Sequence, residues 1–211
     1  MVRHLPVYIV LDTSGSMRGE PIAAVNVGLR SMLSALRQDP FALETVRICL
    51  ITFDIEARIL VSLTSLDQIV IPEVVVPGSG ATFMGKALQL VVDTVRSDAK
   101  APSSNGRRDW RPLLFLMTDG VPSDQHHFDL VIPEVLSCQF ALIIACGAGP
   151  KAKLDTLKRL TKRVVALDTM DAASFAGFFS WVSSSVAGMS SSAGSGSTSL
   201  PPPPDEVNIA I

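Results

Sequence analysis

Five side chains with oxygen atoms lie at or just after the ends of apolar segments. Two are carboxylates and three are hydroxyls, and the set is Asp12, Ser14, Ser16, Thr82 and Asp119. A small, hard dication prefers oxygen ligands and keeps some of its waters. The sequence therefore predicts a metal site at these five residues, with Mg²⁺ as the expected ion and Mn²⁺ or Ca²⁺ as the alternatives.

The ligand types also predict what such an ion does. Hydroxyl groups are neutral, weak ligands, so a site that uses them as direct ligands leaves the charge of the ion undercompensated. An ion with an open position attracts a carboxylate from outside the chain. We therefore expect a partner protein that supplies an Asp or Glu side chain to the metal.

Two apolar segments, residues 7–11 and 113–117, run directly into these carboxylates. Short uninterrupted apolar runs are typical of strands covered on both faces. Apolar residues with helical spacing follow Ser16, over residues 21–37, and also follow Thr82, over residues 84–95. In an open α/β sheet, ligands bind beyond the carboxyl ends of the strands, which is where the five oxygens fall.

The remaining segments continue the alternation of strands and helices. Residues 45–53 and 57–63 predict a hairpin, residues 69–76 an extended run broken by Pro72, and residues 140–146 and 164–167 two further strands. Helices are expected at residues 128–137, 151–162 and 172–186. The predicted fold class is α/β: a doubly wound, mostly parallel sheet with one antiparallel edge strand and helices on both faces.

Composition changes near the end of the chain. Residues 1–188 are predicted to form one domain, and residues 189–211 a flexible tail rich in Ser, Gly and Pro. Residues 207–211 alternate apolar and polar side chains and could add to a sheet edge, but disorder is the favoured interpretation. The polar residues 97–111 are expected to form a surface loop.

Charge and cysteine content limit the function classes. The 211 residues carry a formal net charge of −2, which argues against nucleic acid as a partner. Cys49, Cys138 and Cys146 lack metal-site spacing and predict free, buried thiols in a reducing compartment. No apolar run is long enough to span a bilayer and no signal peptide is recognisable, so we expect a cytoplasmic protein without membrane contact.

These motifs resemble a known family. The pattern Asp12-x-Ser14-x-Ser16 with Thr82 and Asp119 is similar to the metal-ion-dependent adhesion site (MIDAS) of von Willebrand factor type A (VWA) domains, over roughly residues 5 to 187. The segments LPVYIVLDTSGSM, GEPIAAVN, RQDPFALETV, FLMTDGVPSD, ACGAGP and FFSWVSSSV further resemble bacterial tellurium-resistance proteins of the TerY type.

The resemblance implies a Rossmann-like VWA fold in which Ser14, Ser16 and Thr82 face Mg²⁺ directly, and Asp12 and Asp119 act partly through water. It also implies an intracellular adaptor or scaffold rather than an enzyme, in a tellurite-resistance or stress-response system. A protein kinase or phosphatase of the same system is then a candidate partner.

Several alternatives remain open from the sequence alone. Ser, Thr and Asp at strand-to-helix turns are ordinary helix caps. Asp12-Thr13 is also compatible with a metal-assisted phosphohydrolase, although Ser14 stands where the general acid would be. A third possibility is an accessory subunit of a ring ATPase, similar to those of chelatases.

Other motifs favour structural roles. Asp54 suits the hairpin turn better than a ligand role, and His126 and His127 suit a solvated helix start better than a metal site. The cluster of Arg107, Arg108, Trp110 and Arg111 indicates a solvated loop, with a contact for an acidic partner as the alternative.

Overall fold

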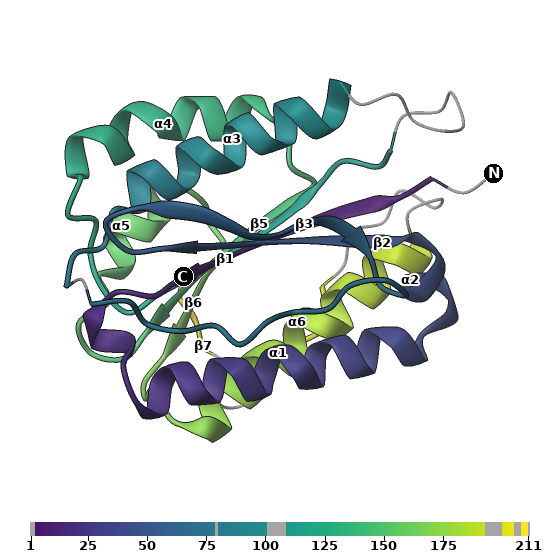
Figure 1. Ribbon diagram of the computed structural model, residues 1–211, viewed down its shortest axis with the longest axis horizontal. Helices are drawn as coiled ribbons and strands as arrows, with labels where there is room; N and C mark the ends of the chain where they lie inside the picture. Colours follow the sequence, from purple (N-terminus) through teal and green to yellow (C-terminus); the bar gives the residue numbers. More distant parts are fainter. Residues whose placement is uncertain (1–2, 79, 101–108, 193–199, 205–207, 211) are drawn as a thin grey trace.

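A twisted sheet forms the centre of the computed structural model, which describes residues 3–78, 80–100, 109–192, 200–204 and 208–210 (Figure 1). Among these residues the sheet has seven strands in the order β3-β2-β1-β4-β5-β6-β7. In chain order the strands are β1 (Leu5–Asp12), β2 (Val46–Phe53), β3 (Ala57–Ser65), β4 (Leu113–Thr118), β5 (Leu142–Ala148), β6 (Val164–Leu167) and β7 (Asn208–Ala210).

The five inner strands are parallel, and each edge strand is antiparallel to its neighbour. β3 returns from β2 as the predicted hairpin, and β7 pairs with β6 at the other edge. The predicted α/β class is thereby confirmed. The preference for disorder at the chain end was wrong for Asn208–Ala210, because β6 offers an edge that the sequence of the tail does not reveal. Val207 and Ile211 lie outside the described residues.

Helices cover both faces of the sheet, as Figure 1 shows. One face carries α1 (Glu20–Gln38), α2 (Pro40–Thr45) and α6 (Ala172–Ser192). The other carries α3 (Met84–Lys100), α4 (Gln125–Ser137) and α5 (Leu154–Lys158). Within the part of the chain that is described, none of these helices has the length and apolar character needed to cross a membrane.

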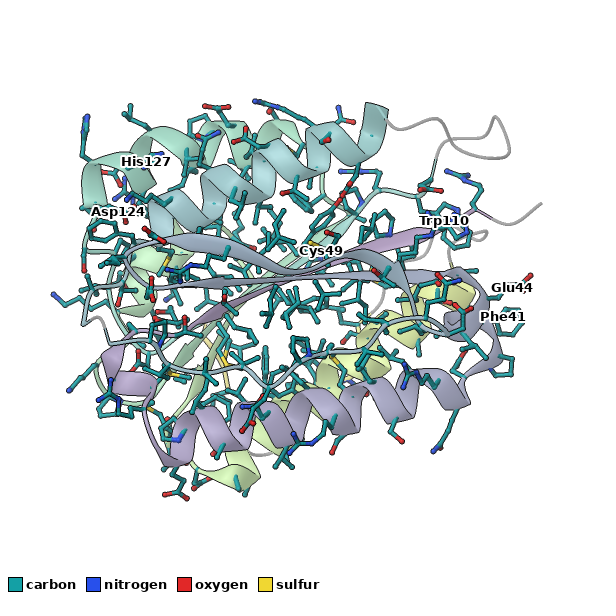
Figure 2. The ribbon with its side chains drawn as sticks, viewed as in Figure 1. Phe41, Glu44, Cys49, Trp110, Asp124 and His127 are labelled. Atoms are coloured by element: carbon teal, nitrogen blue, oxygen red, sulfur yellow. The ribbon has the colours of Figure 1, made fainter. Side chains whose placement is uncertain are left out.

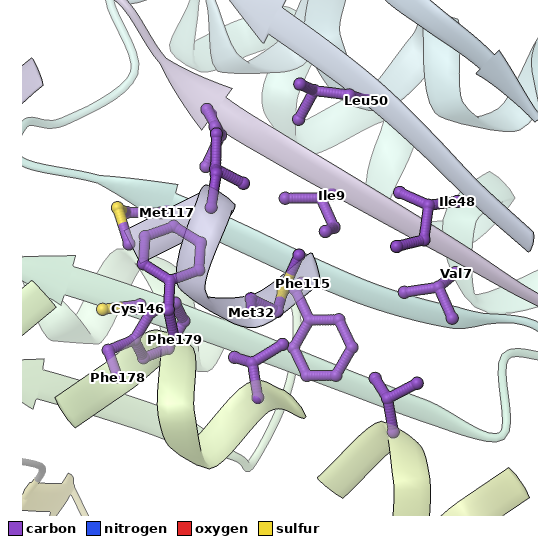
Figure 3. Packing of buried hydrophobic residues seen from close by; sticks show 14 of the residues in the cluster. Val7, Ile9, Met32, Ile48, Leu50, Phe115, Met117, Cys146, Phe178 and Phe179 are labelled. Carbon is purple, nitrogen blue, oxygen red and sulfur yellow. The ribbon is translucent and has the colours of Figure 1, made fainter. Parts of the chain in front are cut away.

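Alternation along β1 supplies two separate cores. Val7, Ile9 and Leu11 belong to the core beneath α1 and α6, whereas Tyr8 and Val10 belong to the core beneath α3 and α4. All five side chains are at most 2% exposed. Figure 3 shows the first core, where Val7 and Ile9 lie near Phe115 of β4, and where Phe178 and Phe179 of α6 belong to the same cluster. A strand covered on both faces explains the unbroken apolar run in the sequence.

Residues 69–76 form no strand, although their β-branched composition predicts an extended run. Ile69 and Val74 are buried against the core beneath α1. The side-chain amide of Asn26 in α1 donates to Val74 O and accepts from Val74 N, both at 2.8 Å. Asn26 thus supplies the hydrogen bonds that a neighbouring strand would otherwise provide, and Pro72 has no N–H to offer a ladder.

Two predicted helices have different lengths in the structure. The helix expected at residues 151–162 is limited to Leu154–Lys158, because a turn with Ala152 N bonded to Gly149 O precedes it. After it, the Thr161 hydroxyl donates to Ile143 O of β5 at 2.8 Å. The last helix, α6, extends to Ser192, so the domain boundary expected at residue 188 falls inside a helix.

The described part of the tail lies against the domain. Ser190 Oγ is 3.0 Å from Thr45 Oγ1 of α2, and the indole Nε1 of Trp181 donates to Pro201 O at 2.9 Å. Together with β7, these contacts attach residues that the sequence assigned to a flexible tail. Residues 193–199, and residues 101–108 of the predicted surface loop, lie outside the described residues; Ser97–Lys100 belong to α3.

Close packing of α1 on α6 depends on Gly28. A Cβ placed on Gly28 would overlap the ring of Phe179 in α6.

Gly28→Ala is therefore expected to lower the free energy of unfolding by about 1 to 3 kcal/mol, since overpacking in a filled core has that cost. Urea unfolding measures the change. Gly188→Ala in α6, where nothing lies within 4 Å of an added Cβ, is the control and is expected to raise stability by about 0.5 to 1 kcal/mol. Equal effects at the two sites would contradict this packing role.

Candidate metal centre

The carboxyl ends of β1 and β4 lie side by side at the centre of the sheet. Leu11 pairs with Met117, so the next residues, Asp12 and Thr118, are neighbours. The chain leaves β1 toward α1 on one face and leaves β4 toward α4 on the other. Such a switch point opens a crevice between two strand ends, and this one contains both predicted carboxylates.

Asp12 is buried and held by two donors. It is 1% exposed; its Oδ1 accepts from Ser14 N at 2.8 Å, and its Oδ2 accepts from the Thr118 hydroxyl at 2.6 Å. Burial raises the pKa of Asp12 to about 6; the hydrogen bonds from Ser14 and Thr118 oppose this rise, and the nearby charge of Asp119 adds to it. Without a cation, the negative charge of Asp12 is therefore costly at neutral pH.

The two serines lie directly beyond Asp12. Ser14 is fully buried, Ser16 is exposed, and their Oγ atoms are 3.3 Å apart. Ser14 precedes the short 3-10 helix η1 (Gly15–Met17), yet its hydroxyl makes no capping hydrogen bond. Thr13 points elsewhere, because its N–H and its hydroxyl both donate to Phe53 O, at 2.8 and 3.0 Å. The helix-cap alternative therefore does not hold for Ser14.

Thr82 reaches the site from the loop ahead of α3. It is 7% exposed, and a Cβ placed on Gly120 would lie 3.4 Å from its Oγ1, which puts this hydroxyl beside the residue that follows Asp119. The hydroxyl hydrogen-bonds no other described residue, and the first amides of α3 are bound by a side chain from another loop. Thr82 is consequently not a helix cap either.

Asp119 provides the observation that most favours a bound cation. It is 2% exposed, and its Oδ1 is the one buried side-chain oxygen or nitrogen among the described residues that lacks a hydrogen-bond partner. Leaving a buried carboxylate oxygen without a donor costs stability unless something else compensates it. A dication beside Asp12 and Asp119 would supply that compensation, and an all-oxygen ligand set suits a hard ion such as Mg²⁺.

Two neighbouring residues at the end of β2 support both halves of the site. Phe53 O accepts the two hydrogen bonds from Thr13, and Asp54 O accepts from Phe83 N at 2.7 Å. The Asp54 carboxylate is 1% exposed and shapes the hairpin turn: Oδ1 accepts from Glu56 N at 2.8 Å, and Oδ2 lies 3.6 Å from Arg58. The expected turn role of Asp54 agrees with these contacts.

The structure thus places Ser14 and Ser16 directly beyond Asp12, the charge of Asp119 near Asp12, and Thr82 beside Gly120, and it leaves the other candidates apart. His127 lies 3.9 Å from Asp124, and no group of three or more His, Cys, Asp or Glu side chains suited to a metal occurs in the described part of the chain. Thr118, which binds Asp12, was not singled out from the sequence. The sequence signal for Thr118 was its position directly before Asp119, at the end of the apolar run 113–117.

Comparison with known families agrees with this geometry. The model of the von Willebrand factor type A domain matches residues 7–174, most of the chain. This protein belongs to the von Willebrand factor type A domain family. Comparison with curated proteins gave no match.

Solved structures share the VWA fold. A von Willebrand factor type A protein from Catenulispora acidiphila aligns with a TM-score of 0.66 at 15% identity, over 88% of this chain and 43% of that one. The pilus adhesin SpaC from Lactobacillus rhamnosus GG gives 0.69 at 13%, over 88% and 30%.

A third structure is proximal thread matrix protein 1 from the mussel byssus, described as having a zinc-occupied MIDAS motif. It gives a TM-score of 0.59 at 14% identity, over 87% of this chain and 48% of that one. This chain spans less than half the length of each of the three proteins.

Removal of one buried carboxylate is expected to abolish stabilisation by metal. For the wild-type chain, Mg²⁺ at a hundred times its dissociation constant should raise the free energy of unfolding by about 2.7 kcal/mol. Asp119→Asn should lose this gain, whereas Asp93→Asn, on the exposed surface of α3, should keep it. Denaturant unfolding with and without Mg²⁺ measures the difference. An equal gain in all three proteins would contradict a metal site at Asp119.

A lower pH should stabilise the metal-free protein but should weaken Mg²⁺ binding. In the metal-free protein the pKa of Asp12 is raised from 3.8 to about 6, so its neutral form is favoured and stability is lost as the pH rises through 6. Relative to Asp12→Asn, metal-free wild type is expected to lose about 2 kcal/mol between pH 4 and pH 7. Mg²⁺ affinity should fall as the pH drops below 6, because protons compete for Asp12. Unfolding and calorimetric titrations across this range test both signs; pH-independent differences would contradict them.

Proposed function

We propose that this chain is a non-enzymatic protein-binding module that acts through a dication held by Asp12, Ser14, Ser16, Thr82 and Asp119. The observation that carries the proposal is the buried, partnerless Oδ1 of Asp119 beside the buried carboxylate of Asp12. A bound dication would offer an open coordination position to an Asp or Glu carboxylate of a partner protein. Mg²⁺ is the proposed ion, with Mn²⁺ or Ca²⁺ as alternatives.

Exposure indicates the side from which a partner approaches. Ser14 and Thr82 are buried and Ser16 is exposed, so the site opens toward solvent at Ser16. Both oxygens of Asp12 accept hydrogen bonds within the chain, and the Ser14 and Ser16 hydroxyls lie 3.3 Å apart, so that both could turn toward one ion. The neutral hydroxyls leave positive charge uncompensated, and that favours an acidic ligand from outside.

Apolar side chains flank the Thr82 loop. Ile55 follows Asp54, whose carbonyl binds Phe83 N, and Val121 follows Gly120, where an added Cβ would lie 3.4 Å from Thr82 Oγ1. Ile55 is 42% exposed and Val121 is 37% exposed. A partner residue that reaches the metal would therefore be an Asp or Glu with aliphatic neighbours rather than one in a polyacidic run.

The arrangement supports binding over hydrolysis. Ser14 occupies the position where a phosphohydrolase would need a general acid, and both oxygens of Asp12 accept hydrogen bonds. A carboxylate held in this way is a poor nucleophile. We expect no Mg²⁺-dependent hydrolysis of p-nitrophenyl phosphate; hydrolysis that disappears in Asp12→Asn would favour the phosphohydrolase instead.

We further propose an adaptor role in a tellurite-resistance or stress-response system in the cytoplasm, with a protein kinase or phosphatase as partner. The support is the similarity of the quoted segments to TerY-type proteins, together with Cys49, Cys138 and Cys146, which are free thiols. An accessory subunit of a ring ATPase is the competing assignment. Mass spectrometry of a co-purified partner separates them: a kinase or phosphatase supports the adaptor, and an ATPase refutes it.

Partner binding should require both the metal and Thr82. The immobilised wild-type chain is expected to retain its partner in Mg²⁺ and release it in EDTA, and Thr82→Ala should reduce retention at least tenfold. Thr94→Ala is the control, because that hydroxyl donates to Leu90 O within α3. The recovered partner, once purified, is titrated by calorimetry against each variant. Equal affinity in EDTA, or equal affinity for Thr82→Ala and wild type, would refute the metal-bridged contact.

A further inference from the structure

A carboxylate from the β4–α4 loop caps the neighbouring helix α3 instead of its own helix. Asp124 Oδ1 accepts from Gly85 N at 3.0 Å, and Oδ2 accepts from Lys86 N at 2.9 Å. Asp124 immediately precedes α4, yet its side chain makes no capping bond to α4. The side chain is 11% exposed, and Figure 2 shows it at the end of α3 that lies nearest the candidate metal centre.

A second pair of hydrogen bonds joins the same two segments at Thr82 itself. Thr82 N donates to Ser123 Oγ at 3.0 Å, and Ser123 N donates to Thr82 O at 2.8 Å. Four hydrogen bonds thus connect residues 82–86 to Ser123 and Asp124. Because Asp119 begins the same loop, these bonds fix the Thr82 backbone relative to Asp119.

The glycine at position 85 makes this close approach possible. A Cβ on Gly85 would lie 2.5 Å from Phe128 N and 2.7 Å from Asp124 Oδ2. Any larger residue would push α3 away from the start of α4 and break the bonds to Asp124. The beginning of α3 is therefore built to receive this carboxylate.

We propose that Asp124 is a positioning residue for the metal site, which sets the Thr82 hydroxyl relative to Asp119 by capping α3 from the β4–α4 loop. The inference rests on the proposed function, since it assigns Thr82 to the metal. A neutral hydroxyl is a weak ligand and contributes only when its oxygen is already held in place. The first N–H groups of α3 have no partner within the helix and carry partial positive charge, which would oppose a nearby dication. The negative charge of Asp124 also offsets this partial charge.

Mg²⁺ titration of the full chain by calorimetry tests this role. Asp124→Ala should weaken Mg²⁺ binding at least tenfold, and Asp124→Asn, which keeps one acceptor, should recover part of the loss. Asp39→Ala is the matched control: Asp39 caps α2 through Ala42 N at 2.8 Å, at the sheet end where Figure 2 shows Phe41, opposite Asp124. Asp39→Ala should lower stability without changing Mg²⁺ affinity.

A double-mutant cycle separates positioning from general destabilisation. If Asp124 acts through Thr82, then Asp124→Ala should cause no further loss of Mg²⁺ affinity in a Thr82→Ala background. An additive loss, or wild-type affinity in Asp124→Ala, would overturn the inference. Should Asp124→Ala fail to fold, Ser123→Ala removes one acceptor from Thr82 and should weaken Mg²⁺ binding several-fold; unchanged affinity there would equally overturn it.

The two proposals fail in different ways. If the wild-type protein binds none of Mg²⁺, Mn²⁺ and Ca²⁺, the proposed function itself is refuted, and the positioning role with it. If wild type binds Mg²⁺ and loses it in Thr82→Ala but not in Asp124→Ala, the metal site stands and only the role of Asp124 is refuted.

Discussion

The burial of two carboxylates at adjacent strand ends is the constraint around which this site is organised. Asp12 and Asp119 are each at most 2% exposed, and burial together with the charge of Asp119 raises the pKa of Asp12. Thr118 and the Ser14 amide satisfy Asp12, but nothing in the described chain satisfies Asp119 Oδ1. The chain thus retains an electrostatic cost that a dication would remove, and that cost distinguishes the site from an ordinary turn.

The surrounding structure relieves the Ser14 and Thr82 hydroxyl groups of helix capping. Thr13 turns to Phe53, whereas the Ser14 hydroxyl lies 3.3 Å from that of Ser16, and the Asp54 carbonyl holds Phe83 next to Thr82. The hairpin of β2 and β3 has a function here beyond covering a sheet edge, because its buried Asp54 shapes the turn that presents this carbonyl. Asp124 caps α3 in the same way, so the Thr82 hydroxyl is not needed as the cap of that helix.

Much of this arrangement follows from local sequence patterns. The apolar runs before Asp12 and Asp119 identify two buried strands, and parallel strand ends meet at one edge of a sheet. The choice between helix caps and free hydroxyls for Ser14 and Thr82 could not be made from the sequence, since both use the same residue types at the same turns. The structure decides it, because Asp124, 38 residues beyond Lys86, provides the cap.

Long-range contacts also explain the features of the fold that the sequence did not predict. Residues 69–76 have the composition of a strand, but Asn26 of α1 binds Val74 in place of a strand partner. The pairing of Asn208–Ala210 with β6 depends on a free sheet edge that no local pattern reveals. Both features are set by tertiary neighbours, whereas the predicted site residues are set by where strands end.

Anomalous diffraction from crystals of the chain grown with Mn²⁺ in place of Mg²⁺ tests the central claim most directly. A single strong peak is expected among the oxygens of Asp12, Ser14, Ser16, Thr82 and Asp119, and it should be absent from crystals of Asp119→Asn. No peak at this position in the wild-type crystals, or an equal peak in the variant, would contradict the metal centre.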